Sequence, residues 1–174
     1  MPDFSSCAKK LGASFNNLDL LVEALTHRSY LNEHREYVGS HNERLEFLGD
    51  AVLELAVTDF LFKKFPAKPE GELTSYRAAL VNTVSLAECA QALGISDFLL
   101  LSKGEQKDTG RAREVILADA FEAIIGAIYL DSGFMAAEQF VAKNLYSRID
   151  DIIAKRSYQD AKSRFQEIAQ EKRG

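Results

Sequence analysis

Three acidic residues cluster in the stretch His41–Leu53, which reads His-Asn-Glu-Arg-Leu-Glu-Phe-Leu-Gly-Asp-Ala-Val-Leu. Glu43, Glu46 and Asp50 are three and four residues apart, so they lie within roughly 60° of one another around an α-helix. The rest of this helix, to Phe65, is apolar on nearly every face, which is typical of a helix inside a fold. Because an unpaired buried charge is costly, these carboxylates need a partner, and we expect a metal ion.

A second apolar segment supplies two more acids. Asp119 and Glu122 are the only charged residues in the range 115–130, and their spacing of three places them on one face of a helix. If the two helices pack with their acidic faces together, they form an all-oxygen cluster without Cys or His. Such a cluster suits Mg²⁺, Mn²⁺ or Ca²⁺ better than Zn²⁺. A Mg²⁺ ion that keeps several waters can support phosphodiester hydrolysis.

Two other interpretations of the acids remain. Each acid taken alone is an ordinary surface residue at a helix edge, although five acids in two apolar helices are poorly explained in this way. A di-iron carboxylate bundle would place Glu-x-x-His pairs on its helices. The spacings here are Glu43-x-x-Glu46 and Asp119-x-x-Glu122, and the three histidines of the chain lie elsewhere.

The elements that must position these acids are helical. Apolar spacing predicts helices over residues 19–27, 42–65, 73–80, 83–93, 115–130 and 135–155, with loops over 30–41 and 103–114. Asn42 could cap the helix that follows it. Gly49 and Gly126 lie inside helices, where Gly costs about 1 kcal/mol relative to Ala, so we expect close helix approach or ligand access there. No strand-like alternation occurs, and we predict an all-α bundle of roughly seven to nine helices.

Bulk composition points to a soluble, cytoplasmic, single-domain protein. The 174 residues are 47% hydrophobic and 27% charged, and no secretory or membrane-spanning segment is evident. The two cysteines give no disulfide framework, so we expect reduced thiols. The net charge of −5 argues against nucleic-acid binding through net positive charge alone. Four of these charges would belong to the metal site, however, which leaves a mixed and locally basic surface feasible.

The sequence around these acids resembles the signature of the ribonuclease III family. The stretch Asn42–Leu53 carries the main motif, and further matches follow in order within residues 5–150. These matches are Ala24–Ser29 (ALTHRS), Glu70-Gly71, Arg77–Val81 (RAALV), Gly104-Glu105 and Ile116–Gly126 (ILADAFEAIIG). No departure occurs at the acidic positions of the motifs.

This resemblance implies an all-helical endonuclease domain that cuts double-stranded RNA with Mg²⁺, for which Mn²⁺ can substitute. By motif position, Glu46, Asp50, Asp119 and Glu122 would bind the metal, and Asp50 and Glu122 would be catalytic. The products would carry 5′-phosphates and short 3′ overhangs. Precursors of ribosomal, messenger and transfer RNA are the substrates that the family suggests.

The resemblance also implies a symmetric homodimer in which each active site cuts one strand. Glu43 and Glu70 match accessory acids that line the cleavage valley. Phe47 matches an aromatic residue that inserts into a socket on the partner subunit, although a core position is the simpler alternative. Arg111 and Arg113, in the expected loop, are candidates for contacts with RNA phosphates or for a solvated loop.

Three ranges divide the chain on this interpretation. Residues 1–153 form the endonuclease domain, residues 154–159 a linker, and residues 160–174 resemble the first helix of a truncated double-stranded RNA-binding domain. The alternative functions are a non-catalytic ribonuclease III-like RNA-binding protein, which would lack one or more of the acids, and a helical bundle around a structural metal.

Overall fold

The protein is helical throughout the part that the computed structural model describes, residues 1–155 and 158. The expected helix at 160–174 and half of the expected linker lie outside the described residues. The helices are α1 (Phe4–Leu11), α2 (Leu18–Ala24), α3 (Arg28–Glu33), α4 (Glu43–Lys64), α5 (Glu70–Leu80), α6 (Thr83–Ala92), α7 (Arg111–Ser132), α8 (Phe134–Val141) and α9 (Arg148–Ala154). Apart from an isolated bridge between Thr26 and Leu100, these residues form no β-structure, which confirms the all-α prediction.

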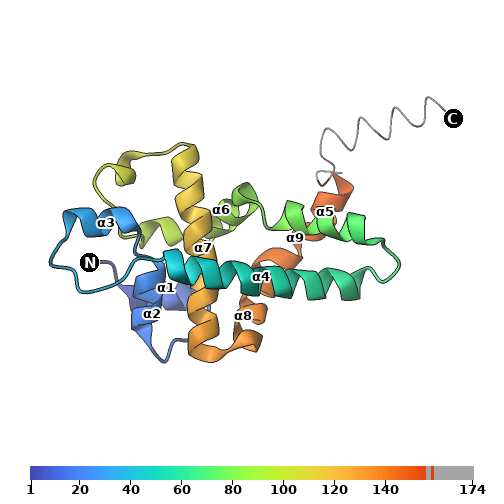
Figure 1. The fold of residues 1–174 in the computed structure, drawn as a ribbon, viewed down its shortest axis with the longest axis horizontal. Helices are drawn as coiled ribbons and strands as arrows, with labels where there is room; N and C mark the ends of the chain where they lie inside the picture. Colours follow the sequence, from blue (N-terminus) through green and yellow to red (C-terminus); the bar gives the residue numbers. More distant parts are fainter. Residues whose placement is uncertain (156–157, 159–174) are drawn as a thin grey trace.

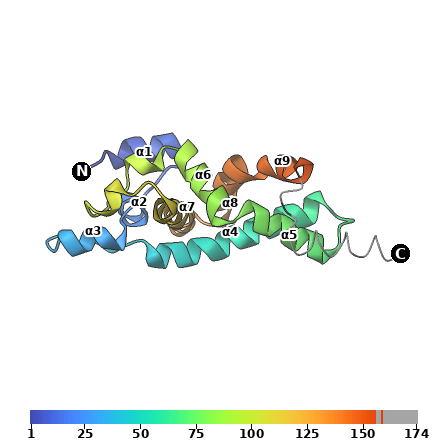
Figure 2. The same cartoon turned by 90° about the horizontal axis from the view of Figure 1, so that it is seen from above.

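Helix α7 is the centre of the bundle. Helices α2, α4, α6 and α8 all pack against it, and Figure 2 looks nearly along its axis. Ile124 and Ile125 are fully buried, as the apolar sequence of this helix predicts. None of the described helices combines the length and the apolar character that crossing a bilayer requires.

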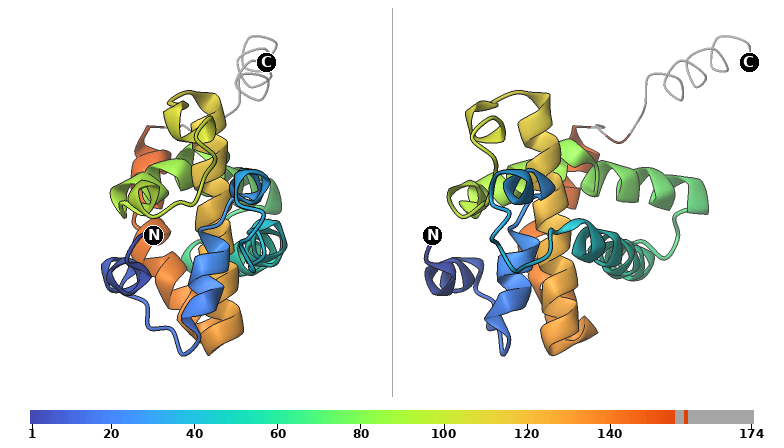
Figure 3. Two further views of the ribbon diagram at one scale, coloured as in Figure 1. Left: turned by 90° about the vertical axis from the view of Figure 1, so that its left-hand side faces the viewer. Right: turned by 60° about the vertical axis from the view of Figure 1, so that its left-hand side comes forward.

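Helix α4 crosses α7 at a steep angle and lies at the surface of the molecule (Figures 1 and 3). Its inner side is fully buried at Leu53, Ala56 and Val57. On its outer side Phe47 is 81% exposed and Phe62 is 69% exposed. The prediction that this helix lies wholly inside the fold was therefore wrong. One apolar face meets the core, and the other is open to solvent.

The crossing of α4 and α7 is built on two glycines. A Cβ added to Gly49 would lie 1.8 Å from the backbone oxygen of Glu122, and a Cβ on Gly126 would lie 2.2 Å from the backbone oxygen of Leu45. The two backbones are therefore in direct contact, and no larger residue fits at either position. The expectation of close helix approach at these glycines is confirmed.

Two segments that the sequence predicts as loops are partly helical. Helix α3 extends to Glu33, and helix α7 begins at Arg111 after Gly110. His27 caps α3, because its Nδ1 accepts a hydrogen bond from the backbone N–H of Ser29 at 3.3 Å. Helix α3 has no buried residue, so it lacks the apolar periodicity from which a helix is predicted.

One predicted helix is interrupted. The range 135–155 forms α8, a π-helical turn over Ala142–Tyr146, and α9. In this turn the ring of Tyr146 stacks on Phe60 at 3.8 Å, and its hydroxyl donates a hydrogen bond to the backbone oxygen of Ala56 at 2.9 Å. These contacts fix the turn against α4. They are long-range, so local periodicity could not reveal the interruption.

Candidate metal centre

Three of the predicted acids meet where α4 crosses α7. Carboxylate oxygens of Glu46, Asp119 and Glu122 lie within 4.8 Å of one another, and all three residues are half-buried. Glu46 precedes Gly49 by three residues, and Glu122 precedes Gly126 by four, so each acid lies about one turn from the glycine contact. The close approach of the two backbones thus brings the acidic faces together.

The negative charge of this cluster is not neutralised by the protein. Burial is the main cause that raises the pKa of Glu122 to about 8, and the neighbouring carboxylates of Asp50, Glu46 and Asp119 contribute to the same shift. Burial is also the main cause of the raised pKa of Glu46 and of Asp119. None of these residues forms a salt bridge with a basic side chain in the described part of the chain.

Such a cluster fits a divalent cation. Its donors are oxygen atoms alone, it offers one ligand atom from each of three carboxylates, and no basic side chain in the described ranges is paired with it. Magnesium and manganese prefer oxygen ligands, and Mg²⁺ in particular is bound by few protein groups and keeps several waters. We conclude that Glu46, Asp119 and Glu122 could hold a divalent metal ion.

The other two acids of the α4 motif lie at the edge of the cluster. Asp50 is exposed and is not among the three residues with converging oxygens, but its charge contributes to the raised pKa of Glu122 and of Glu46. Glu43 forms an ion pair with Arg28 at 3.1 Å, and its charge contributes to the raised pKa of Asp119. Both acids therefore face the cluster without being part of it.

Glu70 is distant from the cluster within one protomer. It begins α5, beyond the far end of α4, and accepts a hydrogen bond from the hydroxyl of Thr74 at 2.9 Å. Even Thr58, the first α4 residue in the lining of the cavity that contains Glu70, lies 12 residues, or roughly 18 Å of helix, beyond Glu46. A single chain therefore does not place Glu70 beside the other acids.

The cavity that contains Glu70 lies between α4 and α5. Its volume is about 370 Å³, and its wall includes the apolar side chains of Leu61, Phe62 and Leu73. We call this cavity the α4–α5 socket. Its lining comes from α4, α5 and the connection between them, so no single sequence motif marks its position.

The two candidate arginines occupy different environments at the start of α7. Arg111 is exposed. Arg113 is half-buried, and its Nη2 donates hydrogen bonds to the hydroxyl of Ser96 at 2.5 Å and to the backbone oxygen of Ser96 at 3.5 Å. Arg113 thus anchors the first turn of α7, whereas Arg111 is open to a ligand.

The raised pKa of Glu122 predicts how the stability of the metal-free protein depends on pH. The folded protein holds a proton up to about pH 8, whereas the unfolded chain releases it near 4.5. The folded state binds more protons in this window, so the free energy of unfolding should fall as the pH rises from about 5 to 8. Thermal unfolding in EDTA at several pH values measures this pH dependence of stability.

Mg²⁺ or Mn²⁺ should raise the melting temperature most at the upper end of this window, because the ion binds the ionised carboxylates. Glu122→Gln is the control for the pH effect, and its melting temperature should vary less with pH. Equal pH dependence in the parent protein and this variant would contradict the assignment of the effect to Glu122.

Comparison with known proteins places these features in context. A family model described as Ribonuclease-III-like matches residues 17–149. The chain is 51% identical to ribonuclease 3 of Geobacillus sp. (strain WCH70) over 167 residues, which are 96% of this chain and 68% of that protein. It is 53% identical to ribonuclease 3 of Protochlamydia amoebophila over 145 residues, which are 83% of this chain and 60% of that protein.

A solved structure also resembles this chain. The nuclease domain of ribonuclease III from Campylobacter jejuni aligns with a TM-score of 0.72 and 43% sequence identity, and the alignment covers 82% of this chain and 98% of that one. That structure is described as showing flexibility in a region involved in dimer formation.

Proposed function

The chain is an endoribonuclease of the ribonuclease III family, and we propose that it hydrolyses double-stranded RNA with Mg²⁺ held at the carboxylate cluster. The observation that carries the proposal is the convergence of Glu46, Asp119 and Glu122, none of which forms an ion pair with a basic side chain among the described residues. When bound, the ion would polarise the scissile phosphate and supply an activated water. Mn²⁺, with similar ligand preferences, would substitute.

We assign separate tasks to the acids of the site. Glu46, Asp119 and Glu122 would hold the ion, and Glu122 would lose its proton when the ion binds. Asp50 is exposed at the edge of the cluster, where it can meet the substrate side of the site. Asp50 and Glu122 are therefore the residues that we propose as catalytic. Glu43 would help to place metal or substrate from the adjacent turn.

The proposed substrate is an A-form RNA duplex, which proteins recognise mainly through its shape, phosphates and 2′-hydroxyls. Arg111 is exposed at the start of α7 and is a candidate for a phosphate contact. Sequence specificity should therefore be weak. Products with 5′-phosphates and short 3′ overhangs, from precursors of ribosomal, messenger and transfer RNA in the cytoplasm, complete the proposal.

We also propose that the active form is a homodimer. Phe47 is 81% exposed beside Glu46, and it shares the outer face of α4 with Phe62, which lines the α4–α5 socket. In a two-fold dimer, Phe47 of each protomer would enter the socket of its partner, because the same surface serves both subunits. The partner's Glu70, which lines that socket, would then lie near Glu46 and complete the row of acids.

Replacing Phe47 should weaken this dimer. Phe47→Ala removes an aromatic anchor that enters a pocket, and such anchors contribute about 2 kcal/mol or more. Two of them act per dimer, so the dissociation constant should rise by about a thousandfold. Sedimentation equilibrium measures this constant.

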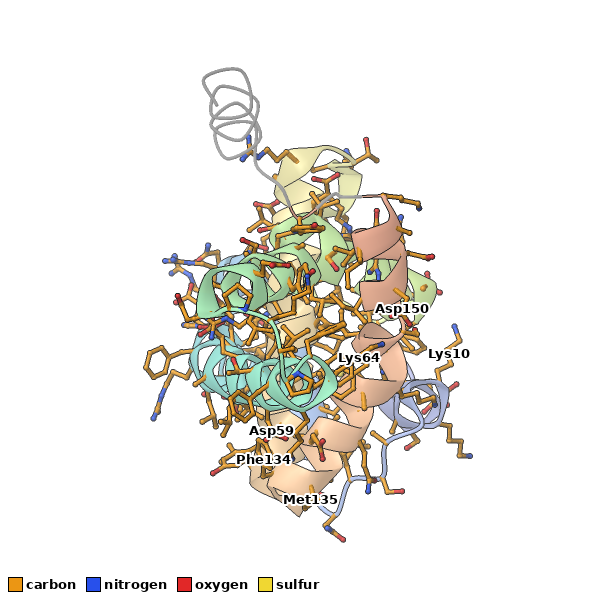
Figure 4. The ribbon with its side chains drawn as sticks, turned by 90° about the vertical axis from the view of Figure 1, so that its right-hand side faces the viewer. Lys10, Asp59, Lys64, Phe134, Met135 and Asp150 are labelled. Carbon is orange, nitrogen blue, oxygen red and sulfur yellow. The ribbon has the colours of Figure 1, made fainter. Side chains whose placement is uncertain are left out.

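Met135→Ala is the control, because Met135 is a 64% exposed apolar residue on α8 (Figure 4). This substitution should leave the dissociation constant unchanged. An unaltered dimer in the Phe47 variant would exclude the socket arrangement.

The direct test of the function compares RNA substrates. The protein is incubated with a long RNA duplex or with either strand alone, in Mg²⁺, Mn²⁺ or EDTA. We expect cleavage of the duplex only, and only with metal. Binding of the duplex without cleavage in either metal would instead favour the non-catalytic RNA-binding alternative.

A further inference from the structure

Tyr158 packs on a buried side chain of α5. Its ring meets the ring of Tyr76 edge-on, with centroids 4.8 Å apart and planes at 88°. Tyr76 is only 2% exposed, and Tyr158 belongs to the partly buried side chains that surround the main core. An edge-to-face aromatic pair of this kind is a favourable contact beyond the area that it buries. Tyr158 is thus docked on the fold although it follows the last helix.

Other residues of α5 form a wall of the α4–α5 socket. Leu73 and Arg77 of α5 both line that cavity. Arg77 connects the wall to α4, because its Nη1 donates a hydrogen bond to the hydroxyl of Thr58 at 2.9 Å and its Nε lies 4.0 Å from a carboxylate oxygen of Glu54. Helix α5 is therefore attached to α4 on its socket side, while Tyr158 contacts it through Tyr76.

A chain of polar contacts links Tyr76 to the rim of the socket. The hydroxyl of Tyr76 donates a hydrogen bond to Glu72 at 3.1 Å, and the same carboxylate oxygen accepts one from Lys68 at 2.7 Å. Lys68 itself lines the socket. Tyr76 also meets the ring of Phe65, at the end of α4, edge-on, with ring centroids 5.4 Å apart. The position of Tyr76 is therefore coupled to both ends of the connection between α4 and α5.

Few other elements hold α5 in place. It lies at the edge of the molecule, and α4, α6 and α9 are its main neighbours (Figure 1). Helix α9 is in turn tied to α4 by an ion pair between Lys64 and Asp150 at 2.8 Å (Figure 4). A peripheral helix with so few neighbours is expected to shift readily when one contact is removed.

We propose that Tyr158 is a positioning residue whose ring packs on Tyr76. This contact, which we call the clasp, holds α5 against α4. It thereby keeps the socket in the shape that accepts Phe47 of a second copy. The clasp gives Tyr158, which lies beyond the end of α9, a role in dimerisation at a distance from the carboxylate cluster. This inference rests on the proposed homodimer. It predicts that a change at residue 158 acts on dimerisation through α5.

Three variants test the clasp. Tyr158→Ala removes the ring, Tyr158→Phe keeps it, and Lys155→Ala changes an exposed residue of the same segment. We expect the dimer dissociation constant of Tyr158→Ala to rise by about tenfold. The other two variants should stay within about twofold of the parent protein. Sedimentation equilibrium on the full chain gives these constants.

Activity as a function of protein concentration separates positioning from general destabilisation. Tyr158→Ala should lose cleavage activity at low concentration and regain the parent kcat well above its dissociation constant. A partly unfolded variant would lose activity at every concentration, and that result would overturn the proposal. So would an unchanged dissociation constant in Tyr158→Ala.

Amide hydrogen exchange distinguishes failure of the clasp from failure of the dimer. The parent protein and Tyr158→Ala are compared at one concentration at which both are monomeric. Faster exchange in α5, with α7 unchanged, supports the clasp even if no dimer ever forms. Equal exchange in α5 contradicts it. A parent protein that stays monomeric at all concentrations would refute the proposed dimer and the role of Tyr158 in it.

Discussion

Glu122→Gln is expected to reduce cleavage of an RNA duplex by about a thousandfold or more while leaving the protein folded. The substitution keeps the shape of the side chain but removes one of three converging carboxylates and its charge. At neutral pH the same change should raise the melting temperature of the metal-free protein by a few degrees, because folding no longer requires a half-buried carboxyl with a raised pKa to take up a proton. Single-turnover cleavage and thermal unfolding in EDTA measure the two effects.

The control for this variant is Glu114→Gln on the same helix. Glu114 is exposed, so its replacement should change neither activity nor stability appreciably. Glu122→Gln should still bind the duplex, since the fold and the surrounding surface persist. Undiminished cleavage by Glu122→Gln would remove Glu122 from the active site.

Gly49→Ala is expected to lower the free energy of unfolding by about 3 kcal/mol or more, and to abolish cleavage. The added Cβ would lie 1.8 Å from the backbone oxygen of Glu122, and neither backbone can move aside without separating α4 from α7. Separation would pull Glu46 away from Asp119 and Glu122. Urea unfolding measures the loss of stability, and the duplex assay measures the loss of cleavage.

Gly71→Ala is the matched control for Gly49→Ala. Gly71 lies in α5, and nothing lies within 4 Å of a Cβ added there. The helix propensity of Ala should therefore leave stability unchanged or raise it by up to about 1 kcal/mol. If Gly49→Ala were as stable and active as Gly71→Ala, the glycine crossing would not be what positions the site.

The sequence predicts the site better than it predicts the helix boundaries. Acids at helical spacing in apolar segments are unusual enough to indicate a cluster, and two glycines within the same segments indicate where the helices meet. Glu46, Asp119 and Glu122 converge in the structure as these patterns predict. Their roles in metal binding and catalysis stay predictions until the variants are measured.

The differences between the sequence predictions and the structure have physical causes. Helix α3 buries no side chain, so it shows no apolar periodicity. The π-helical turn of residues 142–146 depends on contacts of Tyr146 with α4, which are remote in sequence. Glu70 is matched to the other acids by family resemblance, yet one chain leaves it at the far end of α4.

The outer face of α4 could not be recognised from composition. An apolar residue that meets a second protein chain looks the same in a sequence as one that meets the core, so Phe47 and Phe62 made the helix appear fully buried. The structure separates the two faces. One side of α4 contributes Glu46 to the acidic cluster. The outer side presents Phe47 and one wall of the α4–α5 socket for the proposed dimer.

The most direct test of the central claim is a crystal structure of the protein soaked with Mn²⁺ and measured for anomalous scattering. We predict an anomalous peak within coordinating distance of Glu46, Asp119 and Glu122 in every protomer, and its absence in crystals of Glu122→Gln. A fully diffused soak that leaves these carboxylates without a peak, or that places the ion at other residues, would contradict the account.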